Sequence, residues 1–190
     1  MTRRNTLMIA AGIVAVVVTL AGCPQTDQPD IGTITPIETS EEPPALEPAP
    51  DFTLVKAGGG EATLADYRGK ILVIDFWATS CGGCIRDLPN YQKLYDGWDH
   101  DKVEYLGMSL DTRIEIIEKF AEREGVTLPM ALLDDETKTA YLGDGIANIP
   151  QARVIDADGM MRAVLGPSDA SAEHAGEVVA ELLTEATGSG

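Results

Sequence analysis

Two cysteines, Cys81 and Cys84, are separated by two residues and directly follow a long apolar run. The run predicts a buried strand, and the pair would then stand where a helix begins. A thiol in the first turn of a helix faces the positive end of the helix dipole and unpaired backbone N–H groups, and both stabilise a thiolate. We therefore expect Cys81 to be a nucleophile and Cys84, on the same side of the helix, to resolve a mixed disulfide formed at Cys81.

The same spacing also occurs in half of a structural zinc site, which needs two further ligands. The remaining candidates are Cys23, His100 and His174, and their spacing is not typical of a ligand set. Two inert core cysteines are a second alternative, which the glycines at positions 82 and 83 disfavour because they would expose the turn. We expect no metal and no cofactor.

The third cysteine, Cys23, ends a segment that directs the chain to export. Two arginines precede an uncharged apolar run over residues 7–22, the order typical of a secretory signal. The run has only 16 residues, which is short for a helix that crosses a membrane. Its end, Leu20-Ala21-Gly22-Cys23, resembles the bacterial lipoprotein signal box, which implies a signal peptide over residues 1–22 and a lipid on Cys23. An uncleaved anchor with a free Cys23 is the alternative, and both place the following domain outside a membrane.

A change of composition separates this signal from the rest. Residues 24–50 hold seven of the eleven prolines and six acidic residues, with no lysine, arginine or aromatic residue. Such a segment cannot bury enough apolar surface to offset its ordering entropy. We predict a lipidated cysteine and disordered tether over residues 23–50, a folded domain over 51–187 and a disordered end at 188–190. The last few tether residues could alternatively follow the domain surface.

Charge limits the partners. The chain has 190 residues, a formal net charge of −17 and an apolar fraction of 44%. The length suggests one folded domain with an ordinary core. A chain this acidic is repelled by phosphate backbones, so nucleic-acid binding is excluded from the expected functions.

The apolar pattern predicts strands and helices that alternate first, followed by a hairpin and a closing helix. That order is typical of a mixed sheet with helices on both faces. The expected strands are 52–55, 71–77, 103–110, 130–133, 152–156 and 161–165. The first expected helix begins near Cys84, and three further helices are expected over 114–121, 135–142 and 178–183.

Several motifs together resemble the thioredoxin superfamily and, more narrowly, the TlpA/ResA group of membrane-anchored thiol–disulfide oxidoreductases. They are Ala49-Pro50-Asp51-Phe52-Thr53-Leu54, then Phe76-Trp77-Ala78 before the cysteine pair with Pro89 after it, and finally Ile149-Pro150 before Ala152-Arg153-Val154-Ile155-Asp156-Ala157-Asp158-Gly159. The resemblance covers roughly residues 49–187. It implies an α/β thioredoxin-like fold: a central mixed β-sheet flanked by helices, with an extra N-terminal β-hairpin and a central insertion.

The resemblance also implies a substrate-binding surface around the cysteines. Pro150 would be a cis-proline facing the pair, with the backbone of Ile149 pairing to the substrate chain and with Trp77 and Ser80 nearby. Ser80 stands where the group usually has tryptophan, and Gly83 replaces the usual proline. These departures leave the redox direction open.

Asp75 lies in the apolar run six residues before Cys81. It matches the buried carboxylate that, in thioredoxins, is thought to move the proton of the second cysteine, and it is our candidate for proton transfer. A buried carboxylate without a neighbouring cation should have a raised pKa. The position aligned with the neighbouring lysine of thioredoxins is Gly107, which would leave Asp75 unpaired. A carboxylate satisfied by backbone or water is the alternative.

The expected function is an extracytoplasmic thiol–disulfide oxidoreductase that cycles a Cys81–Cys84 disulfide and reduces exported proteins, for example in cytochrome c maturation. Its partners would be protein thiols or disulfides, a membrane redox donor, and the membrane through the lipid on Cys23; we expect a monomer. One alternative is a peroxiredoxin-like peroxide reductase, which the tryptophan at position 77 disfavours because a threonine is needed there. The other is a non-catalytic binding module that captures partners through its thiols.

Overall fold

A computed structural model describes residues 46–188. The predicted signal peptide, Cys23 and the predicted tether up to residue 45 lie outside the described residues. Within 46–188, no helix has both the length and the apolar character needed to span a bilayer.

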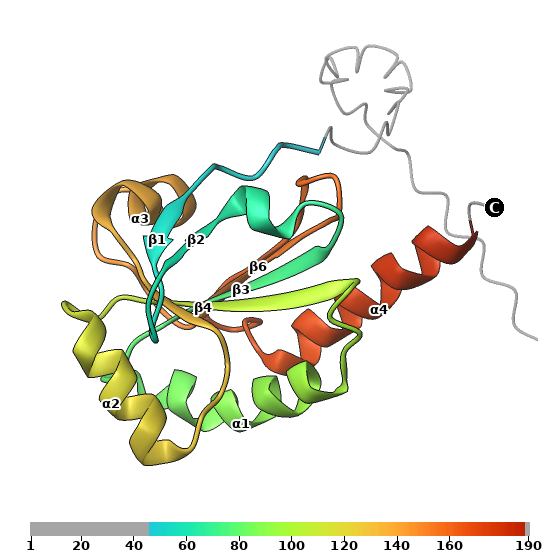
Figure 1. Ribbon diagram of the computed structural model, residues 1–190. Helices are drawn as coiled ribbons and strands as arrows, with labels where there is room; N and C mark the ends of the chain where they lie inside the picture. The colour runs from blue at the N-terminus through green and yellow to red at the C-terminus, as the bar shows by residue number, and fades with distance from the viewer. Residues whose placement is uncertain (1–45, 189–190) are drawn as a thin grey trace, which may run out of the picture. The chain divides into compact units, whose positions relative to one another are not determined.

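A five-stranded sheet forms the centre of the domain, in the order β5-β4-β3-β6-β7 (Figure 1). Strands β4 and β5 run parallel to β3, whereas β6 is antiparallel to β3 and β7 is antiparallel to β6. The predicted mixed sheet is therefore confirmed. The strands are β3 (Ile71–Trp77), β4 (Val103–Ser109), β5 (Met130–Leu132), β6 (Gln151–Ile155) and β7 (Met161–Leu165).

Every residue of β3 is buried, because this central strand is covered on both faces. Full coverage explains why its sequence is apolar throughout instead of alternating. Successive side chains point to opposite faces of the sheet, so Val73 packs in one core cluster and its neighbours Leu72 and Ile74 pack in the other.

Helices α1 (Gly82–Gly97), α2 (Ile114–Glu124) and α4 (Ala172–Gly188) cover one face of the sheet (Figure 1). Helix α2 ends at Gly125, whose φ of 68° is the left-handed conformation that glycine adopts most readily, as the sequence predicts. Helix α4 reaches Gly188, one residue beyond the predicted end of the domain.

The other face carries the extra N-terminal hairpin and the helix of the central insertion, and the resemblance predicts both the hairpin and the insertion. The hairpin joins β1 (Thr53–Val55) to β2 (Glu61–Thr63) and leads into a short 3-10 helix, η1 (Leu64–Tyr67). The insertion between α2 and β6 consists of β5 and α3 (Asp135–Leu142), and Tyr141 of α3 packs in the core cluster on this face.

The chain joins the fold slightly before the predicted domain start at residue 51. Pro48 forms an isolated antiparallel bridge with Met160, and backbone bonds connect Ala49 N to Gly159 O and Met161 N to Glu47 O at 2.9 and 2.8 Å. Residues 47–49, which the sequence assigns to the tether, therefore lie along the turn between β6 and β7.

Candidate active site

Cys81 is the N-cap residue of α1, and its sulfur is bonded to that of Cys84 one turn along the chain. The backbone N–H of Cys84 points at the sulfur of Cys81 with an N···S distance of 3.1 Å. A helix N-terminus presents such N–H groups together with its positive dipole end, so it stabilises a thiolate at Cys81 after reduction. Cys81 is half-buried, whereas Cys84 is only 3% exposed, so an outside thiol or disulfide meets Cys81 first.

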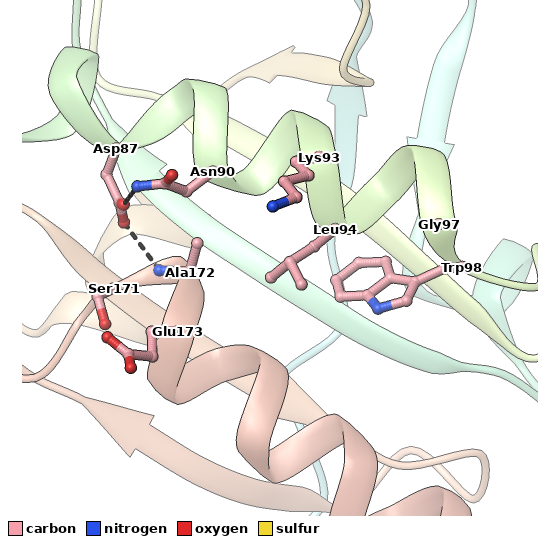
Figure 2. A pocket seen from close by; sticks show the side chains of 9 residues that line it. All are labelled: Asp87, Asn90, Lys93, Leu94, Gly97, Trp98, Ser171, Ala172 and Glu173. Atoms are coloured by element: carbon pink, nitrogen blue, oxygen red, sulfur yellow. Dashed lines mark hydrogen bonds between the residues drawn. The ribbon is translucent and has the colours of Figure 1, made fainter.

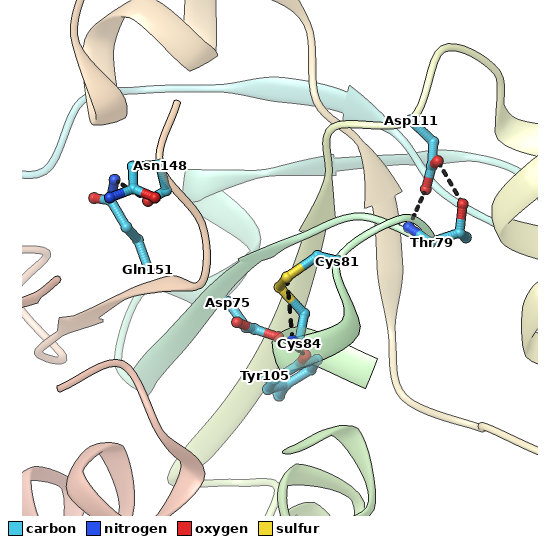
Figure 3. The surroundings of a disulfide bond; sticks show 8 residues. All are labelled: Asp75, Thr79, Cys81, Cys84, Tyr105, Asp111, Asn148 and Gln151. Atoms are coloured by element: carbon cyan, nitrogen blue, oxygen red, sulfur yellow. Dashed lines mark hydrogen bonds between the residues drawn. A yellow bond between two sulfur atoms is a disulfide. The ribbon is translucent and has the colours of Figure 1, made fainter. Parts of the chain in front are cut away.

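A carboxylate at the end of β4 fixes the loop that carries Cys81. Asp111 accepts hydrogen bonds from the backbone N and the hydroxyl of Thr79, at 3.0 and 2.7 Å (Figure 3). It also accepts one from the hydroxyl of Ser109 at 2.7 Å. Because Thr79 stands two residues before Cys81, this network ties the loop between β3 and α1 to the neighbouring strand.

Asp75 is 2% exposed on β3 and belongs to the residues that surround the disulfide in Figure 3. Burial raises the pKa of this carboxyl group to about 7, because the charged form loses its hydration. A hydrogen bond from the hydroxyl of Tyr105, with an O···O distance of 3.0 Å, opposes the rise, and the nearby charge of Asp87 adds to it. Asp75 therefore changes its protonation near neutral pH, where a proton-transfer group is useful.

Gly107 leaves Asp75 without a cation, as predicted, because no cation among residues 46–188 contributes to the shift of its pKa. The hydrogen-bond partner of Asp75 is instead the neutral hydroxyl of Tyr105, two residues earlier on β4. Gly107 does stand opposite Asp75 in the parallel pair of strands, as the alignment implies. A Cβ atom at Gly107 would lie 3.0 Å from the indole nitrogen of Trp77 and 3.2 Å from the hydroxyl of Tyr105. A lysine side chain has no room there, and the tyrosine hydroxyl takes its place beside the carboxyl group.

The Ile149–Pro150 peptide bond is cis, the isomer that the resemblance implies. The proline ring faces the cysteine turn, since a Cβ atom placed on Gly83 would lie 3.8 Å from its Cδ. Ile149 and Pro150 are both half-buried, and Ser80 is exposed beside Cys81. Ser80, Cys81, Ile149 and Pro150 therefore form one surface at the amino end of α1.

Trp77 does not belong to that surface, and its prediction as a substrate-binding side chain is wrong. It has no exposed area, and its ring packs on Phe120 with the centroids 5.2 Å apart. The residue is the last of β3 and points to the face that α2 covers, so it supports the site from within the core.

A buried arginine that the sequence analysis passed over supports the cis-proline loop. Arg153 on β6 is 4% exposed and donates to the carbonyl of Tyr141 at 2.7 Å and to the side chain of Gln151 at 2.9 Å. Gln151 in turn donates to the carbonyl of Asn148, at 2.9 Å, just before the cis bond (Figure 3). The carbonyl of Tyr141 belongs to the last turn of α3, where the negative end of the helix dipole helps to compensate the buried cation.

A groove between α1 and α4 begins at Asp87, three residues after Cys84 (Figure 2). The carboxylate of Asp87 accepts from the backbone N of Ala172 and from the side chain of Asn90, both at 2.8 Å. These bonds fasten the start of α4 to α1.

In residues 46–188, no group of three or more histidine, cysteine or acidic side chains is placed to hold a metal ion.

Replacing Tyr105 with phenylalanine should raise the pKa of Asp75, because the lost hydrogen bond stabilises the charged carboxylate. A hydrogen bond to a charged group contributes about 1.5–3 kcal/mol, so the acidic limb of the pH–rate profile should move up by about one to two pH units. Profiles of kcat for insulin reduction between pH 5 and 9 measure this shift. Tyr95→Phe, which removes a hydroxyl not bonded to Asp75, is the matched control, and an unshifted profile for Y105F contradicts the role of Tyr105.

Comparisons with known proteins agree with this geometry. The family model described as AhpC/TSA matches residues 45–164. The thiol–disulfide oxidoreductases ResA of Geobacillus thermodenitrificans and Geobacillus kaustophilus are 36% and 35% identical over 118 residues, which is 62% of this chain and 66% of each relative. The chain thus spans just under two thirds of these relatives. A solved thiol:disulfide interchange protein from Chlorobium tepidum, at 27% identity, superposes with a TM-score of 0.64 over 73% of this chain and 97% of its own.

Proposed function

Since the chain belongs to the AhpC/TSA family, we propose that it is a thiol–disulfide oxidoreductase that reduces disulfides of other proteins with the Cys81–Cys84 dithiol. One observation carries the proposal: a Cys81–Cys84 disulfide at the start of a helix, facing a cis-proline, with a buried carboxyl group of raised pKa behind it.

The first step of the proposed reaction is an attack by the thiolate of Cys81 on a disulfide of the substrate. The substrate disulfide breaks, a mixed disulfide forms at Cys81, and one substrate sulfur leaves as a thiolate that takes up a proton. The helix N-terminus favours this step because it stabilises the attacking thiolate at neutral pH.

In the second step Cys84 attacks the sulfur of Cys81 and releases the second substrate thiol. The thiol of Cys84 must first lose its proton, and Cys84 is almost fully buried. Asp75 accepts that proton in the proposed mechanism, because its pKa of about 7 allows it to be either charged or neutral near physiological pH. The enzyme ends with two electrons fewer and with the Cys81–Cys84 disulfide that the structure contains.

The surface that receives the substrate is proposed to comprise Ser80, Cys81 and the backbone of Ile149 before Pro150. Arg153 and Gln151 hold that backbone in place from inside the domain through the carbonyl of Asn148.

We further propose that the enzyme acts on the outer side of a membrane, held there by a lipid on Cys23. Its substrates would be disulfides of exported proteins, such as apocytochrome c awaiting haem, and a membrane redox donor would return two electrons to Cys81 and Cys84. These proposals rest on the lipoprotein-like signal and on the motifs that resemble the TlpA/ResA group.

Reduction of insulin tests the proposed activity. The full chain should accelerate the reduction of insulin by dithiothreitol over many turnovers, with Cys81 and Cys84 alternating between thiols and disulfide. A parallel assay with hydrogen peroxide tests the peroxide-reductase alternative. Turnover of peroxide without turnover of insulin, or stoichiometric binding of insulin without turnover, would overturn the proposal in favour of one of the two alternatives.

A further inference from the structure

A polar cavity of about 640 Å³ lies beside the loop that leads to Cys81. Thr79 lines it on one side, and α2 with the residue before it lines the other. Three of its lining residues are cations, Arg113, Lys119 and Arg123, against a single acidic residue, Glu115. This excess of positive charge is unusual for a chain that has 14 basic and 31 acidic residues.

The cations are gathered by the helical repeat of α2. Positions 113, 116, 120 and 123 recur at intervals of three and four, so they share one face of the helix, and Lys119 borders it. The acidic residues Glu118 and Glu122 belong to a different face, and Glu118 accepts a hydrogen bond from the backbone N of Gly58 at 3.0 Å. Glu118 is therefore engaged away from the cavity, and Glu115 is the acidic residue of this helix that lines it.

Several other cations of the domain are neutralised by neighbours. Lys70 pairs with Glu104, Lys102 with Asp99, and Arg162 with Asp156 and Glu185, all within 3.5 Å.

In the cavity, Arg113 and Lys119 have no carboxylate within 4.0 Å among residues 46–188, and the same holds for Lys56 and Lys93 outside it. Arg123 pairs only with Glu124, the next residue, and its guanidinium lies over the ring of Phe120 at 5.5 Å. The positive charge of this face is thus largely available to a partner.

The cavity lies close to the reactive cysteine, so its positive charge can act on a substrate bound there. Thr79 is two residues before Cys81, and Asp111 anchors both its backbone and its hydroxyl. Within the cysteine turn itself, Arg86 lies near Gly82 and Gly83, at 3.6 and 3.9 Å from the positions that their Cβ atoms would occupy. A substrate chain bound at Cys81 is therefore close to positive groups.

We propose that the cationic face, defined as Arg113, Lys119 and Arg123, binds an acidic segment of the protein substrate next to the disulfide that Cys81 attacks. The inference rests on the proposed function and names the kind of protein that it serves. Complementary charge raises the rate of encounter and fixes the orientation of the partner, and it does so most strongly at low ionic strength. The remaining acidic surface of the domain repels such a partner elsewhere and directs it to this end.

Two disulfide peptides of equal length test the proposal, one with four aspartates flanking the cysteines and one with asparagines at the same positions. We expect kcat/KM of the full chain to be about tenfold higher for the acidic peptide at 20 mM salt, and the ratio to approach one at 300 mM salt. In the double variant Lys119→Glu/Arg123→Glu the preference should disappear at both salt concentrations, while turnover of the neutral peptide stays unchanged.

The matched control is Lys56→Glu/Lys93→Glu, which changes the net charge equally but lies away from the cavity, and it should keep the preference. Equal kcat/KM for both peptides in the unmodified chain overturns the inference and leaves the proposed function intact. Loss of the preference in the control as well overturns it too, because net charge alone then explains the selectivity. Failure to turn over either peptide refutes the proposed function itself.

Discussion

Replacing Cys81 with serine is expected to abolish the reduction of insulin, with a loss of about 10⁴-fold or more. A serine hydroxyl at the start of α1 is not ionised at neutral pH, so the helix N-terminus has no thiolate to stabilise. Removal of a covalent nucleophile typically leaves only a small residual rate. Circular dichroism should show a folded domain, because the half-buried Cys81 caps the helix and serine is a favourable N-cap residue.

Cys84→Ser is the informative partner of this variant. It keeps the nucleophile but removes the group that resolves the mixed disulfide, so it should form one covalent adduct with a protein disulfide and then stop. Mass spectrometry after mixing with an oxidised substrate should find the adduct on Cys81 in C84S and no adduct in C81S. An adduct on Cys23, or equal activity of the two variants and the original chain, contradicts the assigned roles.

The second large loss of rate is expected when Asp75 is replaced. Asparagine has almost the same shape and its amide oxygen can still accept the hydrogen bond from Tyr105, but it cannot take a proton from Cys84. Loss of a general base typically costs about 10²–10⁴-fold, so Asp75→Asn should slow the resolving step by about 10²-fold or more. Stopped-flow decay of the mixed disulfide at pH 7.5 measures that step, and formation of the mixed disulfide should change little.

The same substitution should stabilise the folded domain at alkaline pH. Folded Asp75 holds its proton up to a pKa of about 7, whereas the unfolded chain loses it near 3.8. Between these values unfolding releases a proton, so the stability of the original chain falls as the pH rises from about 4 to about 7. The accumulated loss above pH 7 is about 4 kcal/mol at 1.36 kcal/mol per pKa unit.

Asp75→Asn avoids this loss because it carries no charge at any pH. Urea unfolding should therefore find the variant more stable than the original chain at pH 8 by up to about 4 kcal/mol and nearly equal to it at pH 4. Equal stability at pH 8 contradicts the raised pKa, and a variant that is less stable at pH 4 shows that the change of shape, and not the charge, dominates.

The apolar pattern of the sequence predicted the strands of the central sheet, the four α-helices and the position of the cysteine pair, whereas β2 and η1 escaped it. The apolar run at 71–77 is typical of a strand covered on both faces, and the cysteines after it were therefore expected at the start of the next helix. The strong turn at Ala157-Asp158-Gly159 gave the hairpin of β6 and β7.

What the sequence did not reveal are contacts between elements far apart in the chain. Tyr105 could have been found from the register, since residues 105 and 107 share a face of β4 and Gly107 lies opposite Asp75. Asp111 carried only a weak signal, a polar residue just after a strand. The charged side chain of Arg153 inside an apolar strand is a stronger one, and the helix end that compensates it comes from the insertion.

Trp77 is a different case, because the motif suggested contact with the substrate for a residue that lies in the core. The tryptophan belongs to the sequence that precedes the cysteines, so proximity along the chain made it a candidate for contact with substrate. Packing decides otherwise, because the ring of Trp77 lies against Phe120 of α2 and has no exposed area.

Equilibration of the full chain with glutathione or dithiothreitol redox buffers, followed by alkylation and peptide mass mapping, tests most directly whether Cys81 and Cys84 act as one two-electron pair. We predict a single transition in which both cysteines are oxidised together, at roughly −270 mV or below, as for a protein that reduces the disulfides of other proteins. A joint transition at about −120 to −180 mV contradicts the reducing direction. Cysteines that alkylate independently, or never oxidise across the range, contradict the disulfide exchange itself.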